Sequence, residues 1–449
     1  MRVVHVPFGY FPDAVGGTEI YVAELARGLR ARGVESLVAA PAAADVASTY
    51  EHEGTPVVRF PVEAAADVAE LYGEGDESAA RALAAVVDDF SADVLHLHAF
   101  TRAASLRAAR LARRRGIAVA FTYHTPTASC VRGTLLWNGH EPCDGALIAH
   151  RCASCLLQSR GMPSLVREAL ARAPAALGAG LARAGASGSW ATALRARELT
   201  EARHDAFRAL LQEADAVVAV CDWVRRVLLA AGAPAERLRL SRQGTPRVAA
   251  THSARLATDA LRLAYVGRLH PTKGVHVVVE AIAAERDLPI RMDVYGIVQD
   301  NDGARYRDEL VALGGQDARI RFRAPVPPDR VAETLAGYDM TVVPSQWLET
   351  GPLTVLESFA AGVPVVGSNL GGIAELVTHD GDGWLVRHSD GGAWRSALRR
   401  LASDPPLVAR LRAGVRRPRS TDDVAADMVA VYEAIAPGAA RRVAGAALA

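Results

Sequence analysis

Segments typical of strands and of helices alternate along two stretches of this chain, residues 1 to about 245 and residues 258 to about 415. Short apolar runs are followed by longer segments with apolar residues at helical spacing. Repeated strand–helix–strand units of this kind build doubly wound parallel sheets. Because the alternation occurs twice and 449 residues suffice for two cores, the sequence predicts an α/β protein with two Rossmann-like domains.

Residues 247–254 are small or polar and are typical of a linker between the two stretches. We expect an N-terminal domain over residues 1–250, a C-terminal domain over 258–418 and a final segment, 419–449, containing one more helix. Ligands bind beyond the carboxyl ends of the strands in such sheets. The motifs described below follow predicted strands in both halves, so we expect an active site in a central cleft that both domains face.

Charge and hydropathy bear on which partners this chain could bind and on where in the cell it is located. The net charge is +1, and the arginines are scattered opposite carboxylates without a basic stripe interleaved with aromatics, so we expect no nucleic-acid partner. The first strand begins at Arg2 without a charged, apolar leader, and no run of about eighteen apolar residues occurs. These features predict a cytoplasmic protein.

Residues 345–357 carry the most specific chemical signal. Glu349 and Glu357 bracket the step Gly351–Pro352, where proline favours the first turn of a helix. A helix N-terminus offers backbone N–H groups to a phosphate, and a carboxylate can accept hydrogen bonds from two sugar hydroxyls. The pattern predicts a nucleotide-sugar site, although the spacing alone also fits an ordinary helix start.

A second motif precedes it by about eighty residues. An apolar strand ends at Gly267 and Arg268, and a loop with Lys273 and Gly274 leads into a helix. Two cations and two glycines let backbone and side chains approach a diphosphate.

The N-terminal stretch contains a glycine loop and histidines at strand ends. Gly17 opens an amphipathic helix, and the next predicted strands end near His96, His98 and His124. We expect His124 to be functional, and we interpret His96 and His98 as packed strand-end residues that form hydrogen bonds.

These motifs, with the segments 361–366, 371–375 and 381–386, resemble in order and spacing the retaining glycosyltransferases of family 4, which have the GT-B fold. The resemblance is close over residues 258–390 and looser in the N-terminal half. The family usually has serine where Cys221 stands and asparagine where Gln243 stands.

The resemblance implies transfer of a sugar from a nucleoside diphosphate donor, a UDP- or GDP-sugar, to an unidentified acceptor in polysaccharide or glycoconjugate biosynthesis. It implies retention at the anomeric carbon, no cofactor for catalysis, and a last helix that crosses back onto the N-terminal domain. The implied catalytic residues are Glu349, Arg268, Lys273 and His124. The implied donor-binding residues are Gly17, Gly267, Gly351, Pro352, Leu353, Thr354 and Glu357.

Two other functions remain open to the sequence. The chain could be a non-catalytic sugar-nucleotide-binding or scaffold subunit of a glycan-assembly system, although every donor-site position holds a competent residue type. A nicotinamide-dependent oxidoreductase is disfavoured because residues 7–12, after the first strand, lack the G-x-G-x-x-G pattern.

Four of the five cysteines lie in a cysteine-rich loop, residues 125–160, directly after His124. They could hold a structural zinc ion that orders residues 131–148. Independent thiols and disulfides are the alternatives, and a reducing cytosol disfavours disulfides. The candidate zinc ligands are Cys130, Cys143, Cys152 and Cys155.

Residues 162–212 form an insertion of helical segments rich in alanine, leucine and arginine. An apolar stripe around residues 167–183, with arginines on the other side, could lie on anionic lipid as a peripheral membrane contact. We favour the interpretation that the stripe is the core face of a solvated helix, because alanine supplies little apolar area and no bulky aromatic residue precedes Trp190.

Overall fold

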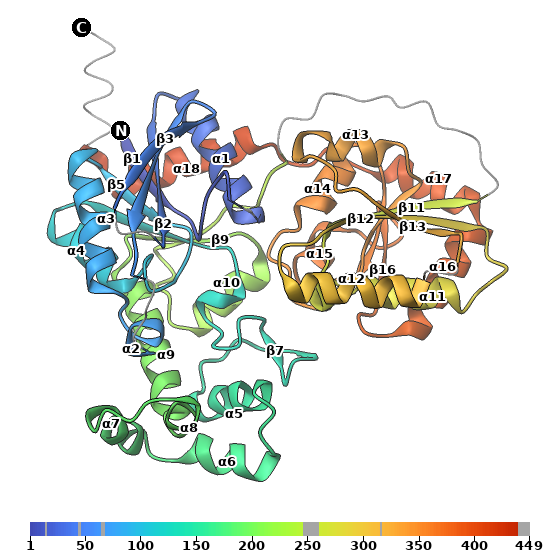
Figure 1. Ribbon diagram of the computed structural model, residues 1–449. Coiled ribbons are helices and arrows are strands. Elements are labelled where there is room, and N and C mark those ends of the chain that lie inside the picture. Colours follow the sequence, from blue (N-terminus) through green and yellow to red (C-terminus); the bar gives the residue numbers. More distant parts are fainter. Residues whose placement is uncertain (14–15, 44–45, 64–67, 246–259, 315–316, 439–449) are drawn as a thin grey trace, which may run out of the picture. The chain divides into compact units, whose positions relative to one another are not determined.

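The structure is a computed structural model that describes the chain except residues 14–15, 44–45, 64–67, 246–259, 315–316 and 439–449. The chain folds into two compact units, Met1–Arg242 with Asp422–Ala449, and Gln243–Thr421 (Figure 1). The expected linker, residues 247–254, lies outside the described residues. The division after Arg242 therefore precedes the expected end of the first domain by several residues.

The sheet of the first unit has eight strands among the described residues, in the order β10-β9-β6-β5-β1-β2-β4-β3. Only the β3–β4 pairing is antiparallel there. The central strands are buried along their length and rich in valine, as expected for a sheet that helices cover on both faces. Their bounds are β1 Arg2–Val6, β2 Glu35–Ala42, β3 Ser48–His52, β4 Thr55–Pro61, β5 Val94–Leu97, β6 Ala118–Tyr123, β9 Ala216–Ala219 and β10 Leu238–Leu240.

Helices surround this sheet, and several begin at side-chain caps that satisfy the first backbone N–H groups. Asp76 accepts a hydrogen bond from the amide of Ala79, and Ser105 accepts one from that of Ala108. The helices of the first unit are α1 Gly17–Arg30, α2 Val68–Tyr72, α3 Glu77–Asp89, α4 Leu106–Arg114, α5 Ala149–Ser159, α6 Ser164–Arg172, α7 Ala175–Arg183, α8 Ser189–Leu194, α9 Ala196–Glu213, α10 Asp222–Ala230 and α18 Thr421–Ile435.

Helix α18 belongs to the first unit although it follows the second unit in sequence. Val424, Met428 and Tyr432 are buried in one core with Val3 of β1. This packing returns the end of the described chain to the N-terminal sheet.

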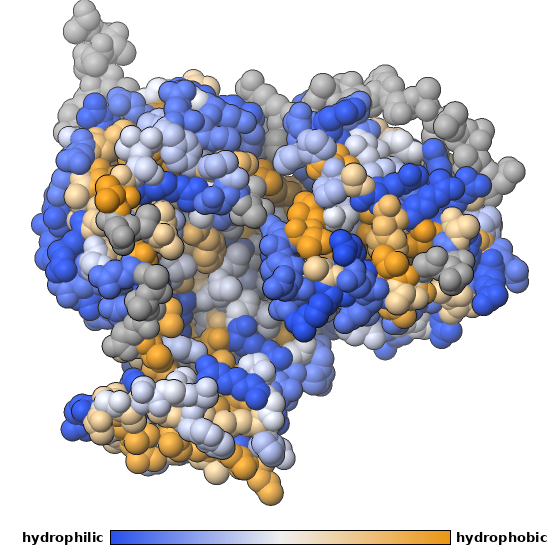
Figure 2. Space-filling model, in the orientation of Figure 1, coloured by the Kyte–Doolittle hydropathy of each residue, from blue (hydrophilic) through white to orange (hydrophobic). Residues whose placement is uncertain are grey.

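Helices α5 to α8 form a lobe that extends from the sheet of the first unit along α9 (Figure 1). Hydrophilic residues cover much of both units, and apolar residues gather at the outer end of this helical lobe (Figure 2). A small two-stranded sheet, β7 Leu136–Trp137 and β8 Glu141–Pro142, lies in the preceding loop.

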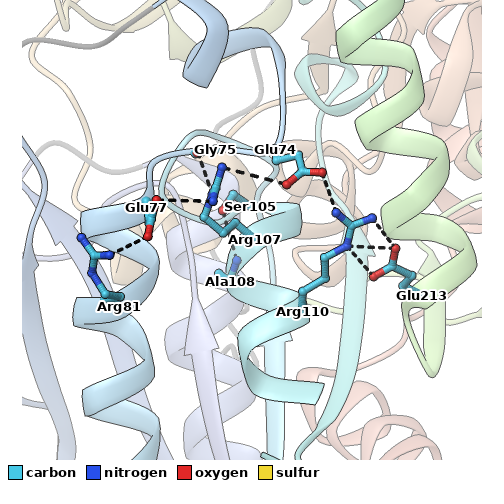
Figure 3. A network of polar contacts seen from close by, with 9 residues as sticks. All are labelled: Glu74, Gly75, Glu77, Arg81, Ser105, Arg107, Ala108, Arg110 and Glu213. Atoms are coloured by element: carbon cyan, nitrogen blue, oxygen red, sulfur yellow. Dashed lines mark hydrogen bonds and ion pairs between the residues drawn. The ribbon is translucent and has the colours of Figure 1, made fainter. Parts of the chain in front are cut away.

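An ion-pair network fixes the sheet-proximal end of α9 (Figure 3). The guanidinium of Arg110 lies between two carboxylates, 2.7 Å from Glu213 and 2.6 Å from Glu74. The Glu213 hydrogen bonds raise the pKa of Arg110, and Glu74 contributes in the same direction. The long helix that carries the lobe is thereby tied to α4 and to the turn before α3.

The sheet of the second unit is entirely parallel over its described strands, in the order β13-β12-β11-β14-β15-β16. Both units are Rossmann-like, as the sequence predicts. The strands are β11 Leu261–Arg268, β12 Ile290–Ile297, β13 Ile320–Arg323, β14 Met340–Val343, β15 Val365–Ser368 and β16 Gly383–Val386. The helices are α11 Val275–Ala283, α12 Asn301–Gly314, α13 Val331–Ala336, α14 Leu353–Ala360, α15 Gly371–Leu376, α16 Gly391–Ser403 and α17 Pro405–Gly414.

Candidate functional site

The loop after β11 lies directly against the loop after β14. Lys273 ends a 3₁₀ turn, and Gly274 follows with a φ of 71°. A Cβ atom at Gly274 would lie 2.0 Å from the carbonyl oxygen of Pro344, so only glycine permits this approach. The amide of Gln346 donates to the carbonyl of Thr272 across 2.7 Å. The two motifs found in the sequence therefore form one contiguous site in the second unit.

Lys273, which is partly buried, and Glu349, which is buried, form an ion pair at the centre of this site. Lys273 Nζ lies 2.6 Å from Glu349 Oε1, and the Ser345 hydroxyl donates to the same oxygen across 2.6 Å. Burial raises the pKa of Glu349, but the Lys273 charge and these hydrogen bonds outweigh that effect and leave the pKa below its usual range. Glu349 is thus ionised at neutral pH.

Lys273 is the only lysine of the chain, and the other residues among its 51 lysines and arginines are all arginines. An ammonium is a compact charge, whereas a guanidinium is a planar fork that needs more room. The single lysine of the chain thus lies beside a carboxylate of the predicted donor site. Its uniqueness is visible in the sequence and could have singled out this position.

Glycines position the backbone of Glu349. The amide of Gly372 donates to the carbonyl oxygen of Glu349 across 2.6 Å. A Cβ atom at Gly372 would lie 2.7 Å from that oxygen, and one at Gly371 would lie 3.0 Å from the amide nitrogen of Glu349. This glycine pair opens the segment 371–375, for which the resemblance implies no role. The structure assigns it the support of the Glu349 backbone.

Helix α14 begins directly after Gly351 and Pro352, and its first backbone amides are of the kind that lack intrahelical partners. The hydroxyl of Thr354 donates to the carbonyl of Val266 across 3.2 Å, which ties the helix start to β11. Glu357 lies one turn further along. Burial raises its pKa to about 7.

Gln243 packs on the start of α14. A Cβ atom added to Gly351 would lie 2.6 Å from Gln243 Oε1. Gln243 is 8% exposed, and its Oε1 has no hydrogen-bond partner among the described residues. The residue that departs from the family pattern thus lies beside the predicted donor-binding segment.

Arg268 and Gly267 end β11. Arg268 is exposed, and its side chain lies 3.3 Å from Gln299 Oε1. Its carbonyl accepts a hydrogen bond of 2.6 Å from the hydroxyl of Tyr265. The guanidinium is therefore on the surface near the site and, unlike Lys273, is not part of the ion pair.

The first unit carries the other predicted residues. Gly17 is the first residue of α1, and the amide of the preceding Gly16 donates to Glu19 Oε2 across 2.8 Å. Glu19 is buried, so this internal contact shapes the helix start.

His124 ends a chain of hydrogen-bonded imidazoles. His98 Nδ1 lies 3.1 Å from His124 Nε2, and His98 Nε2 lies 3.1 Å from His5 Nδ1. His5 Nε2 contacts the Ser36 hydroxyl at 3.3 Å. Burial lowers the pKa of His5 and of His124 to about 3, and it also holds that of His98 well below its usual value. The chain consists of neutral rings at physiological pH.

His96 packs its ring on that of His98, with centroids 3.8 Å apart, but directs its hydrogen bonds to other residues. Its ring nitrogens lie 2.7 Å from the Tyr432 hydroxyl and 2.7 Å from the Thr122 hydroxyl. His96 thus links β5 and β6 to α18, which agrees with its interpretation as a packed strand-end residue.

None of the five cysteines, all of which the structure describes, is in a disulfide. Burial raises the pKa of Cys152 to about 12, and the neighbouring Cys130 and Cys143 add to this effect. Cys155 Sγ instead lies 3.8 Å from the carbonyl oxygen of Leu136. Within the described part of the chain, the set of side chains close enough to hold a metal ion is His5, His96 and His98. Zinc binding by the four cysteines stays a prediction.

Family models match nearly the whole chain. Residues 16–244 match the glycosyl transferase 4-like domain, and residues 251–417 match the glycosyl transferases group 1. The chain belongs to the group 1 glycosyltransferases. Sequence relatives and solved structures give two further comparisons.

Two D-inositol 3-phosphate glycosyltransferases are similar in sequence to this group 1 glycosyltransferase. That of Stackebrandtia nassauensis is 37% identical over 177 residues, 37% of this chain and 40% of the relative. That of Thermobispora bispora is 34% identical over 202 residues, 41% of this chain and 47% of the relative. The matches therefore span less than half the length of these relatives.

Solved structures show that the fold is GT-B. Sucrose-phosphate synthase from Thermosynechococcus elongatus superposes with a TM-score of 0.64 at 18% identity, covering 96% of this chain and 98% of that one. Anabaena HepE in complex with UDP and glucose gives 0.62 at 14% identity over 96% and 98% of the two chains. At these identities the likeness concerns the fold alone.

Proposed function

We propose that this chain transfers a sugar from a nucleoside diphosphate sugar to an acceptor with retention of anomeric configuration. The observation that carries the proposal is the Lys273–Glu349 pair, held beside the start of α14 by two abutting loops. A fixed cation, free helix amides and two carboxylates match the diphosphate, ribose and sugar hydroxyls of such a donor.

The departing diphosphate needs compensation for its developing charge. Lys273, the first amides of α14 and the exposed Arg268 supply positive potential without a divalent cation. Because Lys273 is already held by Glu349, little reorganisation accompanies charge development. This arrangement supports departure of the diphosphate without a divalent metal ion.

The two glutamates have different roles in this proposal. Glu349 is ionised and accepts hydrogen bonds from hydroxyls of the donor sugar. Glu357, whose pKa is about 7, accepts hydrogen bonds from the ribose hydroxyls when ionised. His124 is a neutral imidazole, and the resemblance implies that it lies near the donor sugar.

Retention follows from reaction on one face of the sugar. The bond from the anomeric carbon to the diphosphate oxygen breaks, and a bond to the acceptor oxygen forms on the same face. The acceptor proton passes to the diphosphate oxygen that leaves. This route assigns no protein nucleophile.

A panel of UDP-, GDP- and TDP-sugars screened by thermal shift would identify the donor, because a ligand that binds the native state raises its melting temperature. UDP-sugars come first, since HepE was solved with UDP and with UDP-glucose. Inositol phosphates are reasonable first acceptors, given the names of the sequence relatives. NMR of the product would report its anomeric configuration.

Two outcomes would contradict the proposal. Failure of every nucleotide sugar to stabilise the protein would remove the donor site. Donor binding without transfer to any acceptor and without donor hydrolysis would instead indicate the non-catalytic, sugar-nucleotide-binding subunit.

A further inference from the structure

The outer helices of the helical lobe, α6 to α8, expose large apolar side chains. Leu165 is 86% exposed, Trp190 75%, Leu177 52% and Val166 44%. These four residues fall within 26 consecutive positions, and Figure 2 shows apolar residues gathered at the outer end of this lobe. Single exposed apolar residues are normal on a protein surface, but a group of this kind marks an interaction site.

The amphipathic pattern of these helices is inverted relative to a core face. The residue that α6 buries is Ala171, and the residue that α7 buries is Gly178. The leucines Leu165 and Leu177 of the same helices are exposed instead. The interpretation of the stripe over residues 167–183 as the core face of a solvated helix is therefore wrong for Leu177. Leu170 of α6, by contrast, packs against the core of the lobe.

The same segment is basic. Residues 160–190 contain four arginines and one acidic residue, Glu168. Arg172 and Arg167 share that carboxylate at 2.6 Å and 4.0 Å. Arg160 and Arg183 have no acidic partner among the described residues. The apolar surface is thus accompanied by uncompensated positive charge.

We propose that the outer face of this lobe, centred on Leu165, Leu177 and Trp190, docks on a membrane surface that contains anionic lipid. Leucines beside arginines and a tryptophan are the composition of interfacial helices, whose apolar side chains enter the headgroup region while the cations contact lipid phosphates. No helix among the described residues is long and apolar enough to cross a membrane, so the contact is interfacial.

The charge of this segment favours anionic lipid over a second copy of this chain as the occupant of the apolar face. Two lobes that met face to face would bring like charge together, and the one carboxylate of the segment is already shared by two arginines. Anionic lipid compensates the excess charge. This inference is independent of the donor site in the second unit and does not rest on the proposed function.

The test is flotation of the full chain with vesicles of phosphatidylcholine alone and with 30% phosphatidylglycerol added. We expect binding to the anionic vesicles only, weakened by salt. The Leu165→Ser/Leu177→Ser variant should bind at least about tenfold more weakly. Its matched control is Leu240→Ser/Leu313→Ser, which alters two exposed leucines outside the lobe and should bind as the wild type does. All four positions are exposed, so melting temperatures should not change.

Two further variants probe charge and depth. Arg160→Gln/Arg183→Gln should weaken binding to anionic vesicles and reduce its salt dependence. Of the six tryptophans, Trp190 is the exposed one. Vesicle binding should therefore shift the tryptophan emission to the blue in the wild type, and this shift should be absent in Trp190→Phe.

Three results would overturn the proposal. The first is no binding to anionic vesicles, and the second is equal loss in the Leu240→Ser/Leu313→Ser control. The third is a lipid-free dimer, measured by light scattering, that becomes monomeric in Leu165→Ser/Leu177→Ser, which would identify a second copy as the occupant.

Discussion

Lys273 donates a hydrogen bond of 2.6 Å to Glu349, and the two residues come from loops 76 positions apart in the chain. Glu349 is buried and Lys273 is partly buried, and the charge of Lys273 helps to hold the pKa of Glu349 below its usual range. Removing one partner of such a pair leaves an uncompensated buried charge, whereas removing both does not.

Substitution of Lys273 should therefore separate stability from activity. Lys273→Met should destabilise the second unit by about 3 kcal/mol, and Lys273→Met/Glu349→Leu should recover much of that loss. In both variants turnover should be at least about a hundredfold lower than in the wild type, because the diphosphate loses the Lys273 cation. Urea unfolding and donor turnover measure the two effects. Full activity in the double variant would contradict the role of the pair.

The single lysine also offers a direct probe of donor binding. Reductive ¹³C-methylation at Lys273 adds one side-chain signal beyond that of the α-amino group. We expect this signal to shift on titration with the donor, and we expect the donor to slow the methylation. Lys273→Arg, which removes the signal, serves as the assignment control and should fail to restore activity because the planar guanidinium does not fit the same partly buried position. A signal unmoved by saturating donor would place the diphosphate elsewhere.

The fold was predictable because valine-rich strands alternate with amphipathic helices in both halves. The donor residues were predictable because Arg268, Lys273, Glu349 and Glu357 lie in consecutive motifs along the chain. The tertiary contacts were not predictable from the sequence. The packing of Gln243 on Gly351 and the histidine chain from Ser36 to His124 join residues that are far apart in sequence, and no local spacing encodes them. The interpretation of the stripe over residues 167–183 as a core face was wrong for Leu177 of α7, because helical periodicity does not say which face of a helix is buried.

Glu357 should make donor affinity depend on pH. The folded protein raises its pKa from 4.5 to about 7, so between these values the native state keeps a proton that the unfolded chain releases. Stability from this group is therefore lost as the pH rises through the window, by up to about 3 kcal/mol. Donor binding needs the ionised form, so affinity should be about tenfold weaker at pH 6 than at pH 8.

Glu357→Gln is the matched variant for this prediction. It should bind the donor more weakly, with little pH dependence, and its unfolding free energy should not fall across the same window. Isothermal titration with the donor at several pH values measures the first effect, and denaturant unfolding measures the second. An unchanged pH profile in Glu357→Gln would contradict the assignment.

Gln243 should contribute to donor binding through its unpartnered oxygen or amide. Gln243→Ala should raise the donor KM by about fivefold to tenfold with little effect on melting temperature, since one hydrogen bond is lost. Gln243→Asn, the residue that the family pattern favours, should retain most of the affinity. Gly351→Ala should mimic Gln243→Ala, because its methyl group would displace the Gln243 side chain. Wild-type KM in all three variants would exclude this contact.

Catalysis should survive chelation. Lys273, Arg268 and the start of α14 supply the positive charge that a divalent ion supplies in other enzymes. Turnover should be the same with EDTA as with added Mg²⁺ or Mn²⁺. Loss of turnover on brief chelation that Mg²⁺ alone restores would contradict the proposal. A slow loss of thermal stability without loss of donor affinity would instead report a structural ion, such as zinc at the four cysteines.

His98 should position His124, which it contacts across 3.1 Å. His98→Phe should cost about 1 to 3 kcal/mol of stability, because ring nitrogens of His5 and His124 lose their partner in a buried site. Turnover should fall as well, since the ring of His124 is no longer held. His96→Phe is the control, because His96 is equally buried but bonds Tyr432 and Thr122 instead.

The control variant should lose stability without the drop in kcat that His98→Phe shows. Both variants should also share one effect of acid. Burial holds these histidines neutral in the native state, so the unfolded chain binds protons first, and stability is lost as the pH falls below about 6.5. Each substitution removes one histidine that would bind a proton in the unfolded chain. The fall of the unfolding free energy with decreasing pH should therefore be less steep, by the same amount, in both variants. Equal kcat values in the two variants would show that the imidazole chain has a structural role only.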